Sequence, residues 1–344
     1  MIDQSFWVDR KVLITGHTGF KGSWLACYLS YLGSKVYGLS DYKIISENYN
    51  RINKDNTFQN EYNLDISDNN DELIKVFNLD FDFVFHLAAQ GVVSTAKIKP
   101  LETLSTNIIG SFNIMNLVND NEKINGLVVS TTDKVYSDTA NSNLEESSLG
   151  GKEFYSASKV SAEHIIAAFI NTMSRKDLNI GVVRSGNVLG GGDGGNDRIV
   201  TDIINSLKNN DDIYLRNPES IRPWQYILDS LNGYLMTAEY CVKNNQNEVF
   251  NIGSSQNSEK RVLDLTENII KNWNNDKNIE IKQKQNLFYE SEFLRINSQK
   301  ANDILGWKPL FDLEMISASI VEWYKSDEDE ITMNQIDKFH KMSS

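Results

Sequence analysis

Residues 12–22 have the sequence Val-Leu-Ile-Thr-Gly-His-Thr-Gly-Phe-Lys-Gly, and a helix-like apolar stretch follows from Ser23. A glycine-rich turn is thus expected to join a buried strand to a helix, the arrangement that holds a dinucleotide pyrophosphate. Gly16 could take the positive φ of a tight turn, Gly19 would leave room for the phosphates, and Gly22 would let helix and strand pack closely. The first N–H groups of the helix would face the anion. The glycines alone are equally compatible with a purely structural turn.

The next predicted strand supplies an acidic residue at the distance that this kind of site requires. The segment Lys35–Leu39 ends in Ser40-Asp41, and a carboxylate about 20 positions past the glycines can hold a ribose diol. No arginine adjoins Asp41 to accept a 2′-phosphate, which favours NAD over NADP. Lys21 and Lys43 are nearby cations that leave NADP open as an alternative.

Composition limits the partners of the chain. It has 344 residues, 40% of them hydrophobic, and 34 basic against 47 acidic residues give a net charge of −13. This balance disfavours nucleic acid and anionic membranes as partners, so an anionic substrate would need a local arginine cluster. The two cysteines form no pair motif, and neither a membrane span nor a signal peptide is recognisable. We therefore expect a cytoplasmic protein, and the four scattered histidines predict no metal site.

Alternating elements in the first half of the chain define the expected fold. Apolar, strand-like runs occupy 12–15, 36–39, 83–87, 127–130 and 180–184, and helical patterns occupy 23–32, 68–78, 100–119 and 155–173. Such alternation builds an α/β fold, a Rossmann-type doubly wound parallel sheet covered on both faces. Ligands then bind at the carboxyl ends of the strands.

The pattern loosens after residue 187, which predicts two domains. We expect an NAD-binding Rossmann domain at 1–187, with a returning segment near 223–253. A smaller C-terminal α/β substrate-binding lobe would consist of 188–222 and 254–344. The glycine cluster at 190–195 is compatible with a flexible loop, but we favour a loop that shapes the substrate site because it follows a strand end.

Tyr155 and Lys159 stand four residues apart at the start of a helical stretch, so both side chains project from one helix face. An ammonium beside a phenol stabilises the phenolate, and we expect Lys159 to lower the pKa of Tyr155. The pair occurs by chance on solvated helices. Because it follows a nucleotide-binding turn here, it indicates hydride transfer at an alcohol carbon with Tyr155 as base.

The strand at 127–130 leads into Thr131-Thr132-Asp133-Lys134, which places a hydroxyl, a carboxyl and an amine at one strand end. Alcohol oxidation needs only the hydroxyl. A protonated Asp133 could protonate a leaving hydroxyl, and a desolvated Lys134 could remove the proton α to a ketone, as elimination of water requires. Alternatively, Asp133 and Lys134 simply pair at the start of a loop.

With these motifs the chain resembles the extended short-chain dehydrogenase/reductase family and, within it, the CDP-glucose 4,6-dehydratases. The resemblance covers nearly the whole chain. It rests on the segments 16–25, 86–90, 106–110, 132–134, 155–159, 184–193 and 216–225. The first segment, Gly-His-Thr-Gly-Phe-Lys-Gly-Ser-Trp-Leu, and the last, Arg-Asn-Pro-Glu-Ser-Ile-Arg-Pro-Trp-Gln, are the most specific.

The resemblance implies a nucleotide-sugar substrate and a tightly bound NAD. It implies that Tyr155 is the base in oxidation at the sugar C4, that Lys159 binds the nicotinamide ribose, and that Thr132 hydrogen-bonds the C4 oxygen. Asp133 and Lys134 would then eliminate water across C5 and C6. The implied cofactor-binding residues are Gly16, Thr18, Gly19, Phe20, Lys21, Gly22, Asp41, Asp65, Ile66, Ala88, Ala89, Gln90, Asn107 and Lys159. The implied substrate-binding residues are Asn187, Arg198, Arg216 and Arg222, whose guanidinium groups suit a diphosphate.

The chain departs from the family at the border of the sugar pocket. Relatives continue after Ala-Ala-Gln with proline and then arginine, whereas this chain has Gly91-Val-Val-Ser94, and Phe154 replaces the usual proline. The hexose and the nucleotide therefore stay open. An NAD-dependent sugar-nucleotide 4-epimerase, a 4,6-dehydratase for another nucleotide sugar, and a non-catalytic nucleotide-binding protein are the alternatives, although an epimerase has no use for Asp133 and Lys134.

The resemblance also bears on assembly and pathway. The family commonly pairs two long helices from each subunit, and the helical segments 100–119 and 155–173 carry apolar residues on more than one face. We predict a homodimer, or a tetramer built from it. A place in deoxysugar biosynthesis for surface polysaccharide is implied as well.

Overall fold

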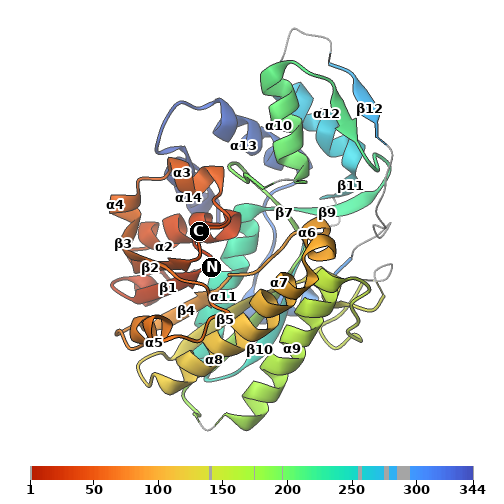
Figure 1. The fold of residues 1–344 in the computed structure, drawn as a ribbon. Helices are drawn as coiled ribbons and strands as arrows, with labels where there is room; N and C mark the ends of the chain where they lie inside the picture. The colour runs from red at the N-terminus through yellow and green to blue at the C-terminus, as the bar shows by residue number, and fades with distance from the viewer. Residues whose placement is uncertain are drawn as a thin grey trace.

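Seven parallel strands form the central sheet in the computed structural model (Figure 1), which describes residues 2–138, 142–173, 175–195, 197–254, 258–274, 279–284 and 295–343. The strands are β1 (Lys11–Thr15), β2 (Lys35–Ser40), β3 (Phe58–Asn63), β4 (Phe83–His86), β5 (Gly126–Thr132), β6 (Asn179–Ser185) and β10 (Glu248–Ile252). Their spatial order is β10-β6-β5-β4-β1-β2-β3. The chain therefore winds outward in both directions from β1 and β4, and the predicted doubly wound sheet is confirmed.

Helices cover both faces of this sheet, and β1 shows why its sequence is continuously apolar. Val12 and Ile14 join one core with residues of α2 (Phe20–Tyr31) and α11 (Ile227–Asn244). Leu13, between them, joins a second core with residues of α5 (Asp71–Phe77), α8 (Ser111–Asp120) and α9 (Phe154–Thr172). All three β1 side chains are completely buried, as expected of a central parallel strand.

Some elements differ from the expectation. The edge strand β3 was not predicted, because its sequence Phe-Gln-Asn-Glu-Tyr-Asn is mostly polar and only Phe58 is buried. The short helices α1 (Gln4–Trp7), α3 (Glu47–Arg51), α4 (Lys54–Thr57) and α6 (Val93–Ile98) were not predicted either. The single helix expected over 100–119 is divided into α7 (Pro100–Leu104), the π-helical turn η1 (Ser105–Gly110) and α8. A π turn inserts one extra residue without changing the apolar pattern enough to be recognised.

The segments after residue 187 build a smaller lobe at the top of Figure 1. It contains β7 (Asn187–Leu189), α10 (Ile199–Asn209), β8 (Ile213–Leu215), β9 (Ile221–Tyr226), β11 (Glu259–Arg261), α12 (Val262–Trp273), β12 (Ile281–Gln283) and α13 (Leu313–Lys325). The π-helical turn η4 (Ala301–Leu305) instead packs against α11 and β10. Strand β9 pairs with both β7 and β11, and β8 pairs with β12. The chain then returns, because α14 (Ile331–Ser343) packs on α2 through a Tyr31–Asp337 hydrogen bond and the ring of Phe339 against Tyr28. The division at residue 187 stays a prediction.

Close packing explains the first glycines of the 190–195 cluster. A Cβ atom at Gly191 would stand 2.1 Å from Cγ of Trp323, and one at Gly192, whose φ is +78°, would stand 2.6 Å from the backbone N of Asn48. The indole of Trp24 also donates to the Gly191 carbonyl at 2.9 Å. These residues join the lobe to α2 and α3, and the proposed shaping of the substrate site by this loop stays a prediction.

Three further observations concern the described part of the chain. None of its helices combines the length and the apolar character that crossing a membrane requires. Within the same residues no group of three or more His, Cys, Asp or Glu is arranged to hold a metal ion. Cys27 and Cys241 are buried free thiols, and burial raises the pKa of each to about 12.

Candidate active site

The glycine turn has the geometry that a dinucleotide needs. Gly16 has a φ of +75°, and a Cβ atom there would stand 2.7 Å from the backbone N of Ala88 at the end of β4. A Cβ atom at Gly22 would stand 2.2 Å from the Gly16 carbonyl oxygen. Helix α2 begins after Gly19 with no side-chain cap, so its first N–H groups are available to a phosphate. The turn therefore fits the pyrophosphate of NAD.

The two acidic residues expected at the adenosine end share one lysine. Nζ of Lys43 lies 2.9 Å from Oδ2 of Asp41 and 2.8 Å from Oδ2 of Asp65. Burial opposes ionisation of Asp65, but the hydrogen bonds from Lys43 and Ser67 lower its pKa. Because Lys43 is paired with two carboxylates, it is not available to bind the 2′-phosphate of NADP. One of the two cations that made NADP an alternative is thereby removed.

Several residues expected to contact the cofactor have side chains committed to neighbouring protein groups. The Thr18 hydroxyl donates to the Ile44 carbonyl at 2.7 Å and shares a hydrogen bond with Ser40. Ile66 is buried in the second core. The Asn107 amide accepts from the backbone N–H of Gln90 at 2.8 Å and donates to its carbonyl at 3.0 Å. Asn107 therefore fixes the Ala88–Gln90 segment after β4.

The five expected catalytic residues come together at the carboxyl end of β5 and the first turns of α9. Thr132 ends β5, and the 3₁₀ turn η2 (Asp133–Val135) follows it. The Thr132 hydroxyl donates to Oδ1 of Asp133 at 3.0 Å. Nζ of Lys134 lies 5.8 Å from the centre of the Tyr155 ring, and Nζ of Lys159 donates to the Ser130 carbonyl at 3.2 Å.

Asp133 has the environment of a carboxyl that keeps its proton. Only 4% of the residue is exposed, and Oδ2 has no hydrogen-bond partner in the described chain. Burial raises the pKa of Asp133, against the opposing influence of the nearby Lys134 charge and the Thr132 hydrogen bond. A buried carboxyl group whose pKa is raised, and which has one oxygen without a hydrogen-bond partner, can act as a general acid.

The expected effect of Lys159 on Tyr155 is wrong for this structure. Burial raises the pKa of Tyr155 to about 12, and the groups that lower it are Thr132 and Arg198. The reason is geometric, because the Lys159 amine is directed to the Ser130 carbonyl. The pKa of Lys159 itself is lowered to about 8 by burial and by the charge of Lys21.

The substrate-binding residues expected from the sequence lie at the border of the smaller lobe. Nδ2 of Asn187 on β7 is buried and has no partner in the described chain, so it is available to a ligand. Arg222 on β9 is 7% exposed, and its charge acts on Asp133. Arg198, at the start of α10, lies 3.8 Å from Asp193.

Arg216 lines a cavity of about 430 Å³ between α10 and β8. One of its Nη atoms lies 3.4 Å from Oδ1 of Asp197. The hydroxyl of Ser94 donates to the other oxygen of Asp197 at 2.7 Å. The segment at which this chain departs from the family it resembles is thus joined, through Asp197, to the arginine that is expected to bind substrate.

Sequence reasoning missed Ser185, Tyr234 and Glu163, which support the site from below the strand ends. Nζ of Lys21 donates to the hydroxyl of Ser185 at 2.7 Å and to that of Tyr234 at 3.2 Å. Glu163 accepts from Thr131 at 2.7 Å and from Nε of Arg184 at 2.9 Å. These partners are far apart in the sequence, and no local pattern connects them.

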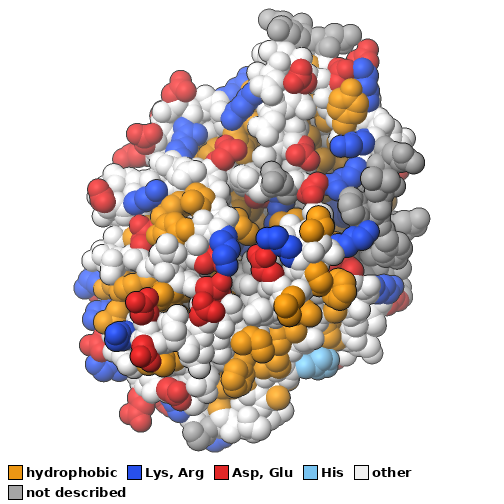
Figure 2. Space-filling model, in the orientation of Figure 1, with side chains coloured by type: hydrophobic (Ala, Val, Ile, Leu, Met, Phe, Trp, Pro, Cys, Tyr) orange, Lys and Arg blue, Asp and Glu red, His pale blue; other side chains and the backbone are white. Residues whose placement is uncertain are grey.

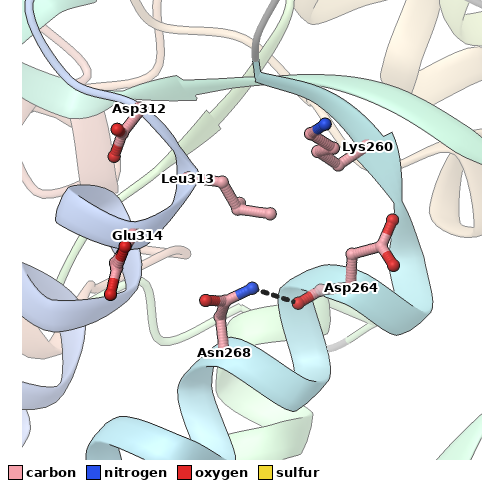
Figure 3. Close-up of a pocket in the computed structure, with 6 residues that line it drawn as sticks. All are labelled: Lys260, Asp264, Asn268, Asp312, Leu313 and Glu314. Carbon is pink, nitrogen blue, oxygen red and sulfur yellow. Dashed lines mark hydrogen bonds between the residues drawn. The ribbon is translucent and has the colours of Figure 1, made fainter.

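Figure 3 shows a second cavity, of about 420 Å³, at the junction of β11, α12 and α13. Its lining residues are Lys260, Asp264, Asn268, Asp312, Leu313 and Glu314. The Asn268 amide donates to the Asp264 carbonyl at 2.8 Å, which is a contact within one helix. None of these residues was expected in the active site.

Fold and site together define a dinucleotide-dependent enzyme of the extended short-chain dehydrogenase/reductase type. The chain belongs to the GDP-mannose 4,6 dehydratase family, whose profile matches residues 13–320. It is 33% identical over 337 residues to a CDP-glucose 4,6-dehydratase of Salmonella typhimurium, and the match covers 95% of this chain and 93% of that protein. The chain is accordingly an NAD-dependent nucleotide-sugar 4,6-dehydratase, a hydro-lyase.

Solved structures agree with the fold. A dTDP-glucose 4,6-dehydratase from Bacillus anthracis in complex with NAD superposes with a TM-score of 0.76 at 23% identity, covering 93% of this chain and 98% of that one. A UDP-N-acetylglucosamine 4-epimerase from Methanobrevibacter ruminantium, in complex with UDP-N-acetylmuramic acid, gives 0.80 at 23% identity, covering 93% and 100%. The same fold thus serves dehydratases and epimerases, so the substrate must be argued from the site.

Proposed function

We propose that the protein is a CDP-glucose 4,6-dehydratase that converts CDP-glucose to CDP-4-keto-6-deoxyglucose. The observation that carries the proposal is the Thr132-Asp133-Lys134 sequence at the end of β5. It sets a buried carboxyl with an unused oxygen and a lysine beside Tyr155. The choice of CDP-glucose rests on the similarity to the Salmonella enzyme along almost the entire chain.

Each catalytic residue has a role that follows from its position. Tyr155 removes the proton of the C4 hydroxyl, and Thr132, at the end of β5, holds the C4 oxygen. When bound, NAD supplies hydride transfer, from C4 at the start of the reaction and back to C6 at its end. Asp133 protonates the leaving C6 hydroxyl, and Lys134 takes the proton from C5, which the C4 ketone acidifies. Lys134 returns this proton to C5 when hydride is added at C6.

The remaining residues bind and orient the two ligands. The glycine turn and Asp41 hold the pyrophosphate and the adenosine ribose of NAD, and Lys159 holds the nicotinamide ribose. Asn187, Arg198, Arg216 and Arg222 hold the sugar nucleotide. Guanidinium groups are suited to a diphosphate, and Arg222 is largely buried next to Asp133. The C4 to C6 region of the sugar would therefore lie between β5 and β9.

Mass spectrometry tests the proposal. Purified protein with catalytic NAD is incubated with CDP-glucose, dTDP-glucose, UDP-N-acetylglucosamine and GDP-mannose. We expect loss of one water from CDP-glucose alone, and we expect Lys134→Ala to abolish it. Loss of water from another nucleotide sugar would move the specificity to that nucleotide. Formation of an isomer that survives Lys134→Ala would replace dehydration by epimerisation and contradict the roles of Asp133 and Lys134.

We also propose that the protein acts as a homodimer, or a tetramer built from it, in the cytoplasm, in a pathway to deoxysugars of surface polysaccharide. Figure 2 shows hydrophobic side chains gathered over α7 and α8. The exposed large hydrophobic residues from α6 to α8 are Ile98, Leu101, Ile109 and Phe112. An apolar surface of this kind is typical of protein–protein interfaces, and α9, the expected partner helix, packs beside α7.

A further inference from the structure

A hydrogen-bonded cluster of hydroxyls joins two lysines at the carboxyl ends of β5 and β6. Lys21, from the first turn of α2, donates to Ser185 at 2.7 Å and to Tyr234 at 3.2 Å. The Tyr234 hydroxyl lies 2.7 Å from the hydroxyl of Ser130. The carbonyl oxygen of that same Ser130 accepts from Lys159 at 3.2 Å. One residue of β5 thus links the amine of the glycine turn to the amine of α9.

The cluster has no carboxylate of its own, and three of its members are buried, whereas Lys21 and Ser130 are half-buried. Tyr234 is fully buried, Ser185 is 2% exposed and Lys159 is 6% exposed. Within the described residues neither Lys21 nor Lys159 forms an ion pair with an acidic side chain, in contrast to Lys43. Two ammonium groups without a direct counter-ion repel each other, and the burial of Lys159 strengthens that repulsion.

Charged groups from several described elements act on Lys159 or are acted on by it. Burial first, and then the charge of Lys21, lower the pKa of Lys159 to about 8, while Glu163 on the same helix raises it. On β4, His86 is fully buried, and its pKa is lowered to about 3 by burial and then by the Lys159 charge, so this histidine adds no positive charge. Lys21 also lowers the pKa of Asp133 against the effect of burial.

We propose that Lys21 is a positioning residue of the dehydratase, which fixes Lys159 through Tyr234 and Ser130 and sets the charge of Lys159 and Asp133 through space. This role differs from contact with the cofactor phosphates, which the sequence implied for Lys21, because its amine is directed to β6 and α11. The inference rests on the proposed function only in taking Lys159 and Asp133 as members of the reacting site.

Nuclear magnetic resonance of protein labelled with ¹³C at lysine Cε tests this role without substrate or cofactor. The Lys159 signal is identified by its absence in Lys159→Met, and its titration is followed in wild type, Lys21→Met and Lys21→Arg. We expect Lys159 to titrate on the order of one pH unit higher in Lys21→Met and to return toward the wild-type value in Lys21→Arg. Lys35→Met, which removes an exposed lysine from β2, should leave the titration unchanged.

Activity supplies the second measurement. Removal of the Lys21 charge should raise the pKa values of both Lys159 and Asp133. Both groups act in their protonated forms, so the alkaline limb of the kcat/KM profile should move to higher pH. Tyr234→Phe keeps the charge of Lys21 but removes the hydroxyl that joins Lys21 to Ser130. It should therefore lower kcat without shifting the pH profile. If Lys21→Met does not fold, Lys21→Gln, whose amide can still hydrogen-bond the hydroxyls, takes its place.

The outcomes separate this inference from the proposed function. An unchanged Lys159 titration in Lys21→Met overturns the inference, even if CDP-glucose is dehydrated. Loss of NAD affinity by calorimetry, with the Lys159 titration unmoved, would make Lys21 a cofactor ligand instead. A shifted titration in a protein that dehydrates no nucleotide sugar would uphold the coupling of the two lysines and reject the proposed function.

Discussion

Asp133 owes its proposed reactivity to burial. For the same reason, removing its acidic proton should lower the activity of the enzyme without lowering the stability of the fold. Replacement by asparagine keeps the shape of the side chain but removes the transferable proton. We expect Asp133→Asn to reduce kcat for dehydration by about 10²- to 10⁴-fold, the usual contribution of a general acid. Loss of water from the substrate, followed by mass spectrometry, measures the change.

The stability of the same variant separates a chemical defect from a folding defect. Burial raises the pKa of Asp133, so the folded protein holds this proton more tightly than the unfolded chain does. The resulting stabilisation is present below the unfolded pKa and is lost as pH rises through the folded pKa. Asp133→Asn should therefore be at least as stable as wild type in urea at pH 8, with a smaller advantage at pH 4. A variant less stable at pH 8 would contradict a buried carboxyl acid.

The sequence brought the proposed catalytic residues to one end of the sheet, but it did not determine the direction in which each side chain points. Thr132, Asp133 and Tyr155 could be placed together because strand ends and helix starts meet at one sheet edge. The four-residue spacing of Tyr155 and Lys159 placed them on one helix face, yet the Lys159 amine donates its hydrogen bond to the Ser130 carbonyl. That choice depends on packing between distant segments, which residue spacing does not encode.

At the scale of elements, the β1–α2 turn depends on glycine for two separable reasons. Gly16 and Gly306 have nearly equal φ values, +75° and +70°, but a Cβ atom collides with Ala88 only at Gly16 and meets nothing within 4 Å at Gly306. Gly306→Ala should cost about 1–2 kcal/mol of unfolding free energy. Gly16→Ala should cost more and should also abolish NAD binding, as urea unfolding and calorimetric titration would show. Equal costs at the two positions would mean that close approach to β4 is unimportant.

Helix α9 is fixed to the sheet by a buried ion pair. Glu163 and Arg184 are each 5% exposed, and Glu163 also accepts from Thr131 on β5. We expect Glu163→Gln to destabilise the protein by about 3–5 kcal/mol, because it leaves a buried guanidinium without its partner. Glu314→Gln is the matched control, since the Lys271–Glu314 pair is more than 70% exposed on both sides. Urea denaturation should show no measurable effect for the control, and similar effects of both variants would contradict this account.

Elements with strong apolar character were predictable, and those stabilised by a single neighbour were not. The central strands β1, β4, β5 and β6 lie where their continuous apolar sequences placed them. Strand β3 pairs with β2 alone and exposes half of its side chains, so its sequence lacks the usual apolar pattern of a strand. The short helices α3 and α4 also lack a recognisable apolar pattern. Each begins at a capping side chain, Ser46 and Asn53 respectively, that accepts a hydrogen bond from a backbone N–H of the helix.

The whole molecule presents an apolar surface that the single chain does not cover. Ile98 and Leu101 are each 79% exposed, although burial of such side chains is worth about 1.5–3 kcal/mol apiece. We expect light scattering at micromolar concentration to give at least twice the 39.1 kDa chain mass. The double variant Ile98→Glu, Leu101→Lys should give one chain mass while keeping the far-ultraviolet circular dichroism of wild type. Val8→Lys, which adds a charge at another exposed apolar residue, should stay assembled. Wild-type protein with the mass of one chain would show that these side chains do not form a self-interface.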